Sequence, residues 1–408
     1  MNCPVKRRTV IGAVGGFATV SLAGCLEDDT DGAADDDAEN ADDADPDDNG
    51  GNGDDEPEAV GSDGLVYAFA PNRISILDPA DGDVVDEITE EFDDESWAEP
   101  QITHDYGLIF AVEETLDQVH VIDTETRTHE AAIDVGPGIN HMYHPVDDEI
   151  WVHADDEGAF YVIDVDDLEV SEIVEVGLDD EGHGKLLYHE EMGDTGYATN
   201  VNDPGIAVVD LESYERSDFI EFGDSGGTHY KAYGPQNDLV YAEYFGGTTV
   251  VDTETEEVVD ELDFTGGMFL SPEEDRLAIV DDDVYFVDVS DEDSEVLGSV
   301  EIDGGPSTVR FGPDGADAFV ATAGSGDVAV VDIDTLEEVD RLDVGDVDGR
   351  SRMAVSGDEY FVTPADVDEA VAVVEMTAQE VDLIDVGAPV DTVQYVGDSG
   401  TGYTGRYR

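Results

Sequence analysis

Residues Gly304–Gly345 read GGPSTVRFGPDGADAFVATAGSGDVAVVDIDTLEEVDRLDVG, a stretch in which four short apolar runs alternate with turn-forming residues. Each run has the length of a β-strand. Glycine, proline and aspartate are concentrated between them, as in Gly312-Pro313-Asp314-Gly315. The stretch therefore predicts four strands, at Ser307–Phe311, Ala318–Ala321, Val328–Asp332 and Val339–Val344.

The same unit recurs along the chain, and its third strand ends each time in an acidic residue. These acids are Asp78, Asp123, Asp164, Asp210, Asp252, Asp288, Asp332 and Glu375, at intervals of 36 to 46 residues. A four-stranded repeat with a period of about 43 residues is typical of a β-propeller blade. We expect an all-β propeller of eight four-stranded blades, or seven if the short repeat around residues 283–300 forms no full blade.

Residues 62–98 supply only three strands before the first complete blade begins. The missing inner strand is expected from the C-terminal side, at Asp391–Val396, which would make a composite blade that closes the ring and leaves no free sheet edge. The propeller domain is therefore predicted at residues 62–408.

The repeat resembles the YVTN-type (YncE-like) propeller repeat. Phe311-Gly312-Pro313-Asp314-Gly315 and Val328–Asp332 match its Ser-Pro-Asp-Gly turn and its following apolar strand, whereas other blades match only in part, as at Leu270-Ser271-Pro272. The resemblance covers about 340 residues and implies a scaffold shared by surface proteins, metal-handling proteins and cofactor-bearing enzymes. It implies no single function.

Residues 1–25 have the features of an export signal. Lys6-Arg7-Arg8 is a twin-arginine pattern before a short apolar run, and Leu22-Ala23-Gly24-Cys25 resembles a lipobox, whose cysteine would carry the lipid. Residues 26–61 consist almost entirely of Asp, Glu, Ala, Asn and Gly, a composition that predicts a disordered acidic linker. We therefore expect an exported lipoprotein on the cell surface, attached to the membrane by its lipid.

The charge is strongly negative, with 15 basic and 106 acidic residues and a net charge of −91. Nucleic acid is excluded as a partner because phosphate binding needs a cationic surface. The acidic residues are interspersed with regular Val- and Ile-rich runs that can form a folded core. Concentrated salt would screen the repulsion between these acids. The composition resembles that of haloarchaeal proteins and predicts a halophilic protein.

Histidines are distributed unevenly, since all nine lie between residues 104 and 229. One set is expected near the start of three inner strands, at His141, His183 and His229. A second, alternative set is expected near the end of three inner strands, at His104, His144 and His189. Neutral imidazoles from neighbouring blades could hold zinc or copper, and hydrogen-bonded structural histidines are the competing interpretation. His120 and His129 are interpreted as surface residues and His153 as structural.

Four of the few bases also fall in inner strands, at Lys185, Lys231, Arg310 and Arg352. They could pair with surrounding acids or form a patch for the carboxylates of an anionic ligand or cofactor. Both cysteines, Cys3 and Cys25, lie in the leader, so the propeller has no thiolate ligand or nucleophile.

These observations favour a lipid-anchored binding module that holds a transition metal or metal cofactor on the propeller axis. An enzyme similar to the haem d1 propeller of cytochrome cd1 nitrite reductases is a second hypothesis, in which haem replaces zinc or copper. A surface scaffold that binds a protein partner and no ligand is a third. No catalytic residues are predicted, because the sequence contains no nucleophile motif.

Overall fold

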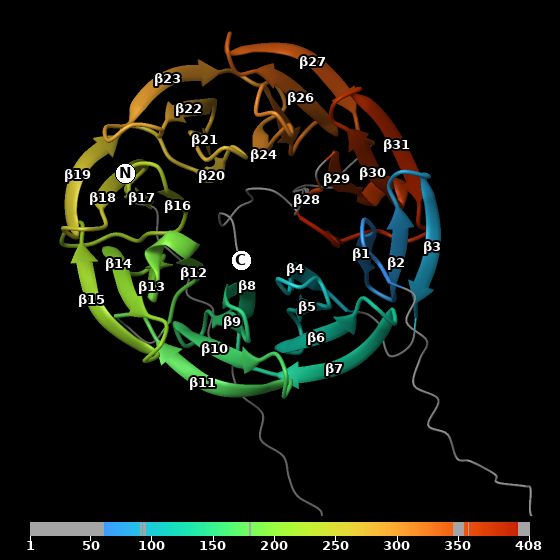
Figure 1. Cartoon of the computed structure of the whole chain (residues 1–408), viewed down its shortest axis with the longest axis horizontal. Helices are drawn as coiled ribbons and strands as arrows, with labels where there is room; N and C mark the ends of the chain where they lie inside the picture. The colour runs from blue at the N-terminus through green and yellow to red at the C-terminus, as the bar shows by residue number, and fades with distance from the viewer. Residues whose placement is uncertain are drawn as a thin grey trace, which may run out of the picture. The chain divides into compact units, whose positions relative to one another are not determined.

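The computed structural model describes residues 61–89, 92, 95–178, 181–345, 355–357 and 359–398. The predicted leader with Cys25, all but the last residue of the predicted linker, and Arg352 lie outside these residues. Eight antiparallel sheets of four strands each are arranged in a ring, so the prediction of an eight-bladed propeller is confirmed (Figure 1).

One strand of each blade lies next to the central channel. These innermost strands are β4 (Trp97–Ile102), β8 (Ile139–Val146), β12 (Gly184–Leu187), β16 (Lys231–Gly234), β20 (Gly267–Leu270), β24 (Pro306–Phe311), β28 (Val355–Ser356) and β32 (Thr392–Tyr395). The second strands are β1 (Val66–Ala70), β5 (Leu108–Glu113), β9 (Glu149–Ala154), β13 (Thr195–Asn200), β17 (Leu239–Tyr244), β21 (Arg276–Val280), β25 (Asp317–Thr322) and β29 (Tyr360–Ala365).

The third and fourth strands complete each blade toward the outside of the ring. The third strands are β2 (Arg73–Asp78), β6 (Gln118–Asp123), β10 (Ala159–Asp164), β14 (Gly205–Asp210), β18 (Gly247–Asp252), β22 (Val284–Asp288), β26 (Asp327–Asp332) and β30 (Ala370–Glu375). The outermost strands are β3 (Asp83–Ile88), β7 (Thr128–Asp134), β11 (Glu169–Glu175), β15 (Glu215–Glu221), β19 (Glu257–Leu262), β23 (Glu295–Val300), β27 (Glu337–Asp343) and β31 (Glu380–Asp385).

Helical structure is limited to two short 3₁₀ turns in the described part of the chain, η1 (Glu190–Met192) and η2 (Asp366–Asp368). Neither they nor any other described segment forms a helix with the length and apolarity needed to cross a bilayer.

Burial falls from the inner to the outer strands of a blade. All of β1, VYAFA, is buried, whereas in β3, DVVDEI, every residue before Ile88 is exposed. Blades pack face to face, so a second strand has apolar neighbours on both sides and can be apolar throughout. The outermost strand has a solvent-facing side, and acidic residues occupy it, as in β19 and β27.

The recurring acid at the end of the third strand holds the turn into the outermost strand. The Asp123 carboxylate accepts hydrogen bonds from the backbone N–H and the hydroxyl of Thr126, at 2.7 and 2.9 Å. Arg127, which follows, has a φ of +58°, and Leu336 has a φ of +53° at the equivalent turn after Asp332. The acid therefore recurs because it closes this turn.

The C-terminal strand completes the first blade, as the sequence predicts. β32 pairs antiparallel with β1, with Val66 opposite Tyr395 and Phe69 opposite Thr392. The Asp391 carboxylate also accepts a hydrogen bond of 3.2 Å from the backbone N–H of Trp97, at the start of the second blade. The repeat with residues 283–300 forms a complete blade from β20 to β23, which rules out the alternative of seven blades.

Candidate metal centre

Three histidines from consecutive blades meet beside the central channel. His141 is the third residue of β8, His183 directly precedes β12, and His229 lies two residues before β16. One ligand atom from each lies within 4.8 Å of the other two, and no other group of three potential ligands this close occurs in the described part of the chain. The structure thus brings together the three histidines predicted near the start of the inner strands.

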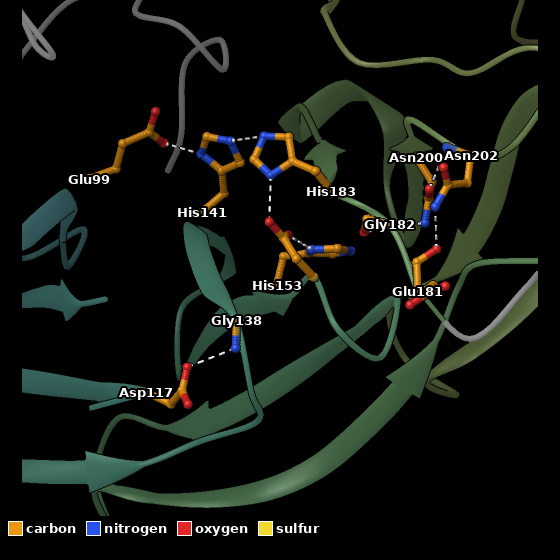
Figure 2. Close-up of polar contacts among 11 residues, drawn as sticks. Glu99, Asp117, Gly138, His141, His153, Glu181, Gly182, His183, Asn200 and Asn202 are labelled. Carbon is orange, nitrogen blue, oxygen red and sulfur yellow. Dashed lines mark hydrogen bonds and ion pairs between the residues drawn. The ribbon is translucent and has the colours of Figure 1, made fainter. Parts of the chain in front are cut away.

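Glycines allow the loops before β12 and β16 to approach their neighbours closely. A Cβ on Gly184 would lie 2.5 Å from the backbone oxygen of Thr199, and one on Gly227 would lie 1.8 Å from that of Val201. Two side-chain amides support the loop before His183, with Asn202 donating to the backbone oxygen of Glu181 at 2.9 Å (Figure 2). Any larger residue at Gly184 or Gly227 would move a candidate ligand.

Carboxylates hold the Nδ1 atoms of two of these histidines. His141 Nδ1 lies 2.7 Å from Glu99 of β4, and His183 Nδ1 lies 2.7 Å from Asp155 (Figure 2). Asp155 also contacts His153 Nδ1, at 2.8 Å. Glu243 lies 3.9 Å from His229 Nδ1. Metal-binding histidines commonly donate their second ring nitrogen to a carboxylate in this way.

The opposite ring nitrogens are placed to bind a cation. His141 Nε2 and His183 Nε2 lie 3.0 Å apart, within hydrogen-bonding distance of each other, while the Nδ1 atoms of both rings face carboxylates. His229 Nε2 is buried without a hydrogen-bond partner. A cation that replaced the hydrogen shared by the first pair would satisfy all three nitrogens, so the donor set fits a metal ion.

Burial keeps two of the three histidines neutral. It lowers the pKa of His141 to about 4, although Glu99 opposes the shift. Burial, followed by the positive charge of Lys185, lowers the pKa of His229 to about 2. The pKa of Glu99 lies well below its usual value, because the interactions with His141, Lys185 and Lys231 together outweigh its burial. At neutral pH these histidines need no deprotonation before they bind a metal.

Two of the predicted basic residues lie next to this centre. Lys185 and Lys231 are almost fully buried, and their ammonium groups lie 5.8 Å from the ring centre of Tyr230 and 5.3 Å from that of Tyr143. Burial lowers the pKa of Lys185 to about 8. Arg310 lies on β24, two blades beyond β16, with its guanidinium 5.5 Å from the ring of Phe269. Arg310 is thus not brought into the group around Lys185.

The alternative histidine set does not form a second group of three. The rings of His104 and His144 stack with their centres 3.8 Å apart, and each Nδ1 has its own acceptor, at Asp147 and at the backbone oxygen of Glu149. His189 instead contacts Glu274, at 3.4 Å.

Two further histidine interpretations are corrected in part. His120 is buried, because Trp97 and Phe92 lie next to its ring. Its Nδ1 atom lies 3.0 Å from His129 Nε2. Its interpretation as a surface residue is therefore wrong. His153 is fully buried and reaches His183 through Asp155. It is structural, as predicted, but it supports a candidate ligand.

The sequence interpretation missed the carboxylates Glu99, Asp155 and Glu243. With 106 acidic residues in the chain, composition gave no reason to choose these three. One local signal was available, since His153 and Asp155 are separated by one residue at the end of a strand that neighbours β8.

No protein-family model matches the sequence, and no curated protein matches it. Solved structures do share the fold. The dihydro-haem d1 dehydrogenase NirN, solved in complex with DHE, superposes with a TM-score of 0.68 at 14% identity, covering 84% of this chain and 77% of NirN. AztD from Citrobacter koseri superposes with a TM-score of 0.60 at 14% identity, covering 83% of this chain and 98% of AztD. Hydrazine synthase from Kuenenia stuttgartiensis gives 0.52 at 14% identity, covering 71% and 95%. These likenesses concern the fold alone.

Proposed function

We propose that this protein is a binding module that holds a transition-metal ion beside the propeller channel through His141, His183 and His229. The observation that carries the proposal is the convergence of the two facing Nε2 atoms, 3.0 Å apart, with the buried and unpaired Nε2 of His229. Three imidazoles with one position left for water or another ligand suit zinc or copper.

The surroundings support the same interpretation. Glu99 and Asp155 fix two of the ligand rings, and the negative charges of both lie close enough to offset part of a bound cation's charge. The side chain of His183 is 29% exposed and that of His229 is 22% exposed, so the centre lies near solvent although His229 Nε2 itself is buried.

The test is metal analysis of the full chain carrying Cys3→Ser and Cys25→Ser, purified in concentrated salt. We expect one equivalent of zinc or copper by mass spectrometry, or saturable binding of one equivalent in a titration. His183→Ala should weaken binding at least ~100-fold, because one of three ligands is lost. His104→Ala, which removes a half-buried histidine outside the centre, is the matched control. A protein that binds neither ion would refute the proposal.

We also propose that the module is exported and attached to the membrane through a lipid on Cys25. The support is Lys6-Arg7-Arg8 and the lipobox-like Leu22–Cys25, both in the sequence alone. The acidic composition of residues 26–61 would keep the domain away from the membrane surface, where it could meet a protein partner. Incorporation of labelled lipid that persists in a Cys25→Ser variant would contradict the anchor.

A haem-binding redox propeller is the second candidate, favoured by the fold shared with the dihydro-haem d1 dehydrogenase and by the buried bases Lys185 and Lys231. Carboxylates of a macrocycle could pair with such bases. The purified protein's absorption spectrum separates the candidates, because haem absorbs strongly in the visible region. If the purified protein contains no metal and shows no visible absorption, the third hypothesis remains, a scaffold that binds a protein partner and no ligand.

A further inference from the structure

The three ligand rings are not arranged symmetrically around their common centre. The ring centres of His141 and His183 are 4.7 Å apart, those of His183 and His229 are 4.9 Å apart, and those of His141 and His229 are 6.4 Å apart. His183 therefore lies between the other two. This asymmetry bears on which ion the centre accepts.

Each coordination geometry fixes these separations. An ion about 2.0 Å from Nε2 lies about 3.1 Å from the ring centre, so a tetrahedral ion places all three ring centres about 5.1 Å apart. A square-planar ion places neighbouring rings about 4.4 Å apart and opposite rings about 6.3 Å apart. The two short separations and one long separation match three corners of a square, with His141 and His229 opposite each other.

One pair of ligand nitrogens can be compared in the same way. Two nitrogens about 2.0 Å from one ion and at a right angle are separated by about 2.8 Å, whereas at the tetrahedral angle they are separated by about 3.3 Å. The observed separation of His141 Nε2 and His183 Nε2 is 3.0 Å. A zinc ion, which has four tetrahedral ligands in most protein sites, would require the rings of His141 and His229 to move toward each other.

The backbone opposes such a movement. His141 lies within β8 and is held by Glu99, and the loop of His229 is confined where Gly227 meets the backbone of Val201. Both outer ligands are thus fixed by contacts with different blades. The stacked pair His104 and His144, with ring centres 3.8 Å apart, is closer than either geometry allows for two ligands of one ion.

From this geometry, and resting on the proposed metal-binding function, we infer that the centre is specific for copper(II), bound in a square plane. Square-planar and tetragonal geometry with nitrogen ligands is typical of copper(II), whereas zinc has no preference for it. His141, His183 and His229 occupy three corners, and the fourth, opposite His183, is left for a small exogenous ligand.

The test uses the full chain carrying Cys3→Ser and Cys25→Ser, loaded in concentrated salt with one equivalent of copper(II), cobalt(II) or zinc(II). We expect an axial copper(II) paramagnetic resonance spectrum with hyperfine coupling to three nitrogens. His183→Ala should reduce this number to two, and His104→Ala should leave it at three. Copper(II) should bind at least ~1,000-fold more tightly than zinc(II), and azide should add a charge-transfer band by occupying the fourth corner.

The outcomes separate this inference from the proposed function. An intense tetrahedral cobalt(II) spectrum, with zinc(II) bound within ~10-fold of copper(II), would overturn the copper inference but leave the metal centre in place. If none of the three ions binds, the metal centre itself is refuted. Circular dichroism of each metal-free variant shows whether a lost signal reflects the ligand or the fold. If His183→Ala does not fold, His229→Ala replaces it with the same expectation.

Discussion

At the scale of single residues, the candidate centre depends on imidazoles that are buried in the neutral form. Burial keeps His141 and His229 uncharged, which removes charge repulsion between these two rings before any ion is present. The same effect acts on His144 of the stacked pair. Burial, followed by the proximity of His104, lowers the pKa of His144 to about 4. The folded protein therefore opposes protonation of its buried histidines.

Because the folded protein disfavours protonation of His144, its stability should depend on pH, and a substitution of His144 should remove that contribution. The unfolded chain protonates His144 near pH 6.5 and the folded chain only near pH 4, so folding loses stability as the pH falls through this window. His144→Asn keeps a donor toward the backbone of Glu149 but cannot titrate. Relative to the parent, we expect it to gain about 1.4 kcal/mol per pH unit near pH 5 and about 3 kcal/mol in total between pH 7 and pH 4. Denaturant unfolding in concentrated salt at several pH values measures this, and parallel curves would contradict it.

Histidine positions could be predicted from the sequence, whereas their carboxylate partners could not. The nine histidines are few and confined to residues 104–229, so a pattern of three inner-strand starts stands out. Glu99 and Asp155 belong to the commonest residue class of the chain and come from different strands. Only the pairing of blades shows which of these acids meet a histidine.

At the scale of strands and turns, each blade is stabilised by a hairpin between its third and outermost strands. The acid that ends the third strand accepts hydrogen bonds from the turn, and in seven blades the register shifts by one residue just before this acid, as between Val121 and Ile122 of β6. Such a bulge increases the local twist of the sheet, which helps neighbouring blades to pack in a ring.

Removing one of these acids should weaken its hairpin. Asp123→Ala removes the acceptor for the backbone N–H and the hydroxyl of Thr126, and we expect a loss of about 1–2 kcal/mol of unfolding free energy. Glu125→Ala is the matched control, because it removes the same charge from an exposed position in the same turn. Equal effects of the two variants on thermal unfolding would show that charge, rather than the turn, is responsible.

Strand positions were predictable from the sequence because turn chemistry marks both ends of each strand. The predicted run Val328–Asp332 corresponds to β26, Asp327–Asp332, and Ser307–Phe311 corresponds to β24, Pro306–Phe311. The register shifts were not predictable, because an extra residue in a strand leaves the alternation of side chains almost unchanged.

At the scale of the whole molecule, the negative charge is concentrated where the blades face solvent. The outermost strands carry exposed acids, while the second strands are mostly apolar, and β1 is buried along its whole length. Arg73 and Arg341 are among the few basic residues that pair with these acids, at Glu87 and Glu338. Repulsion around the outside of the ring is therefore mostly uncompensated by the protein itself.

We expect the propeller to unfold when salt is removed. At ~1 M salt the Debye length is about 3 Å, which screens neighbouring acids on the outer strands, and at ~10 mM it is about 30 Å, which screens almost none of them. Circular dichroism during dialysis from 2 M to about 50 mM potassium chloride measures the change. A non-ionic osmolyte at equal osmolarity is the control, and an unchanged spectrum in low salt would contradict the prediction.

The strand that completes the first blade, β32, is the last strand of the described part of the chain and is synthesised long after β1. Until Thr392–Tyr395 has been made, one side of Val66–Ala70 presents unpaired main-chain groups to any other strand nearby. A chain still on the ribosome, or one shortened by a late stop codon, therefore has an incomplete first blade. The unpaired edge of its β1 strand can pair with strands of other chains. We expect misassembly to start at that edge until β32 has paired with β1.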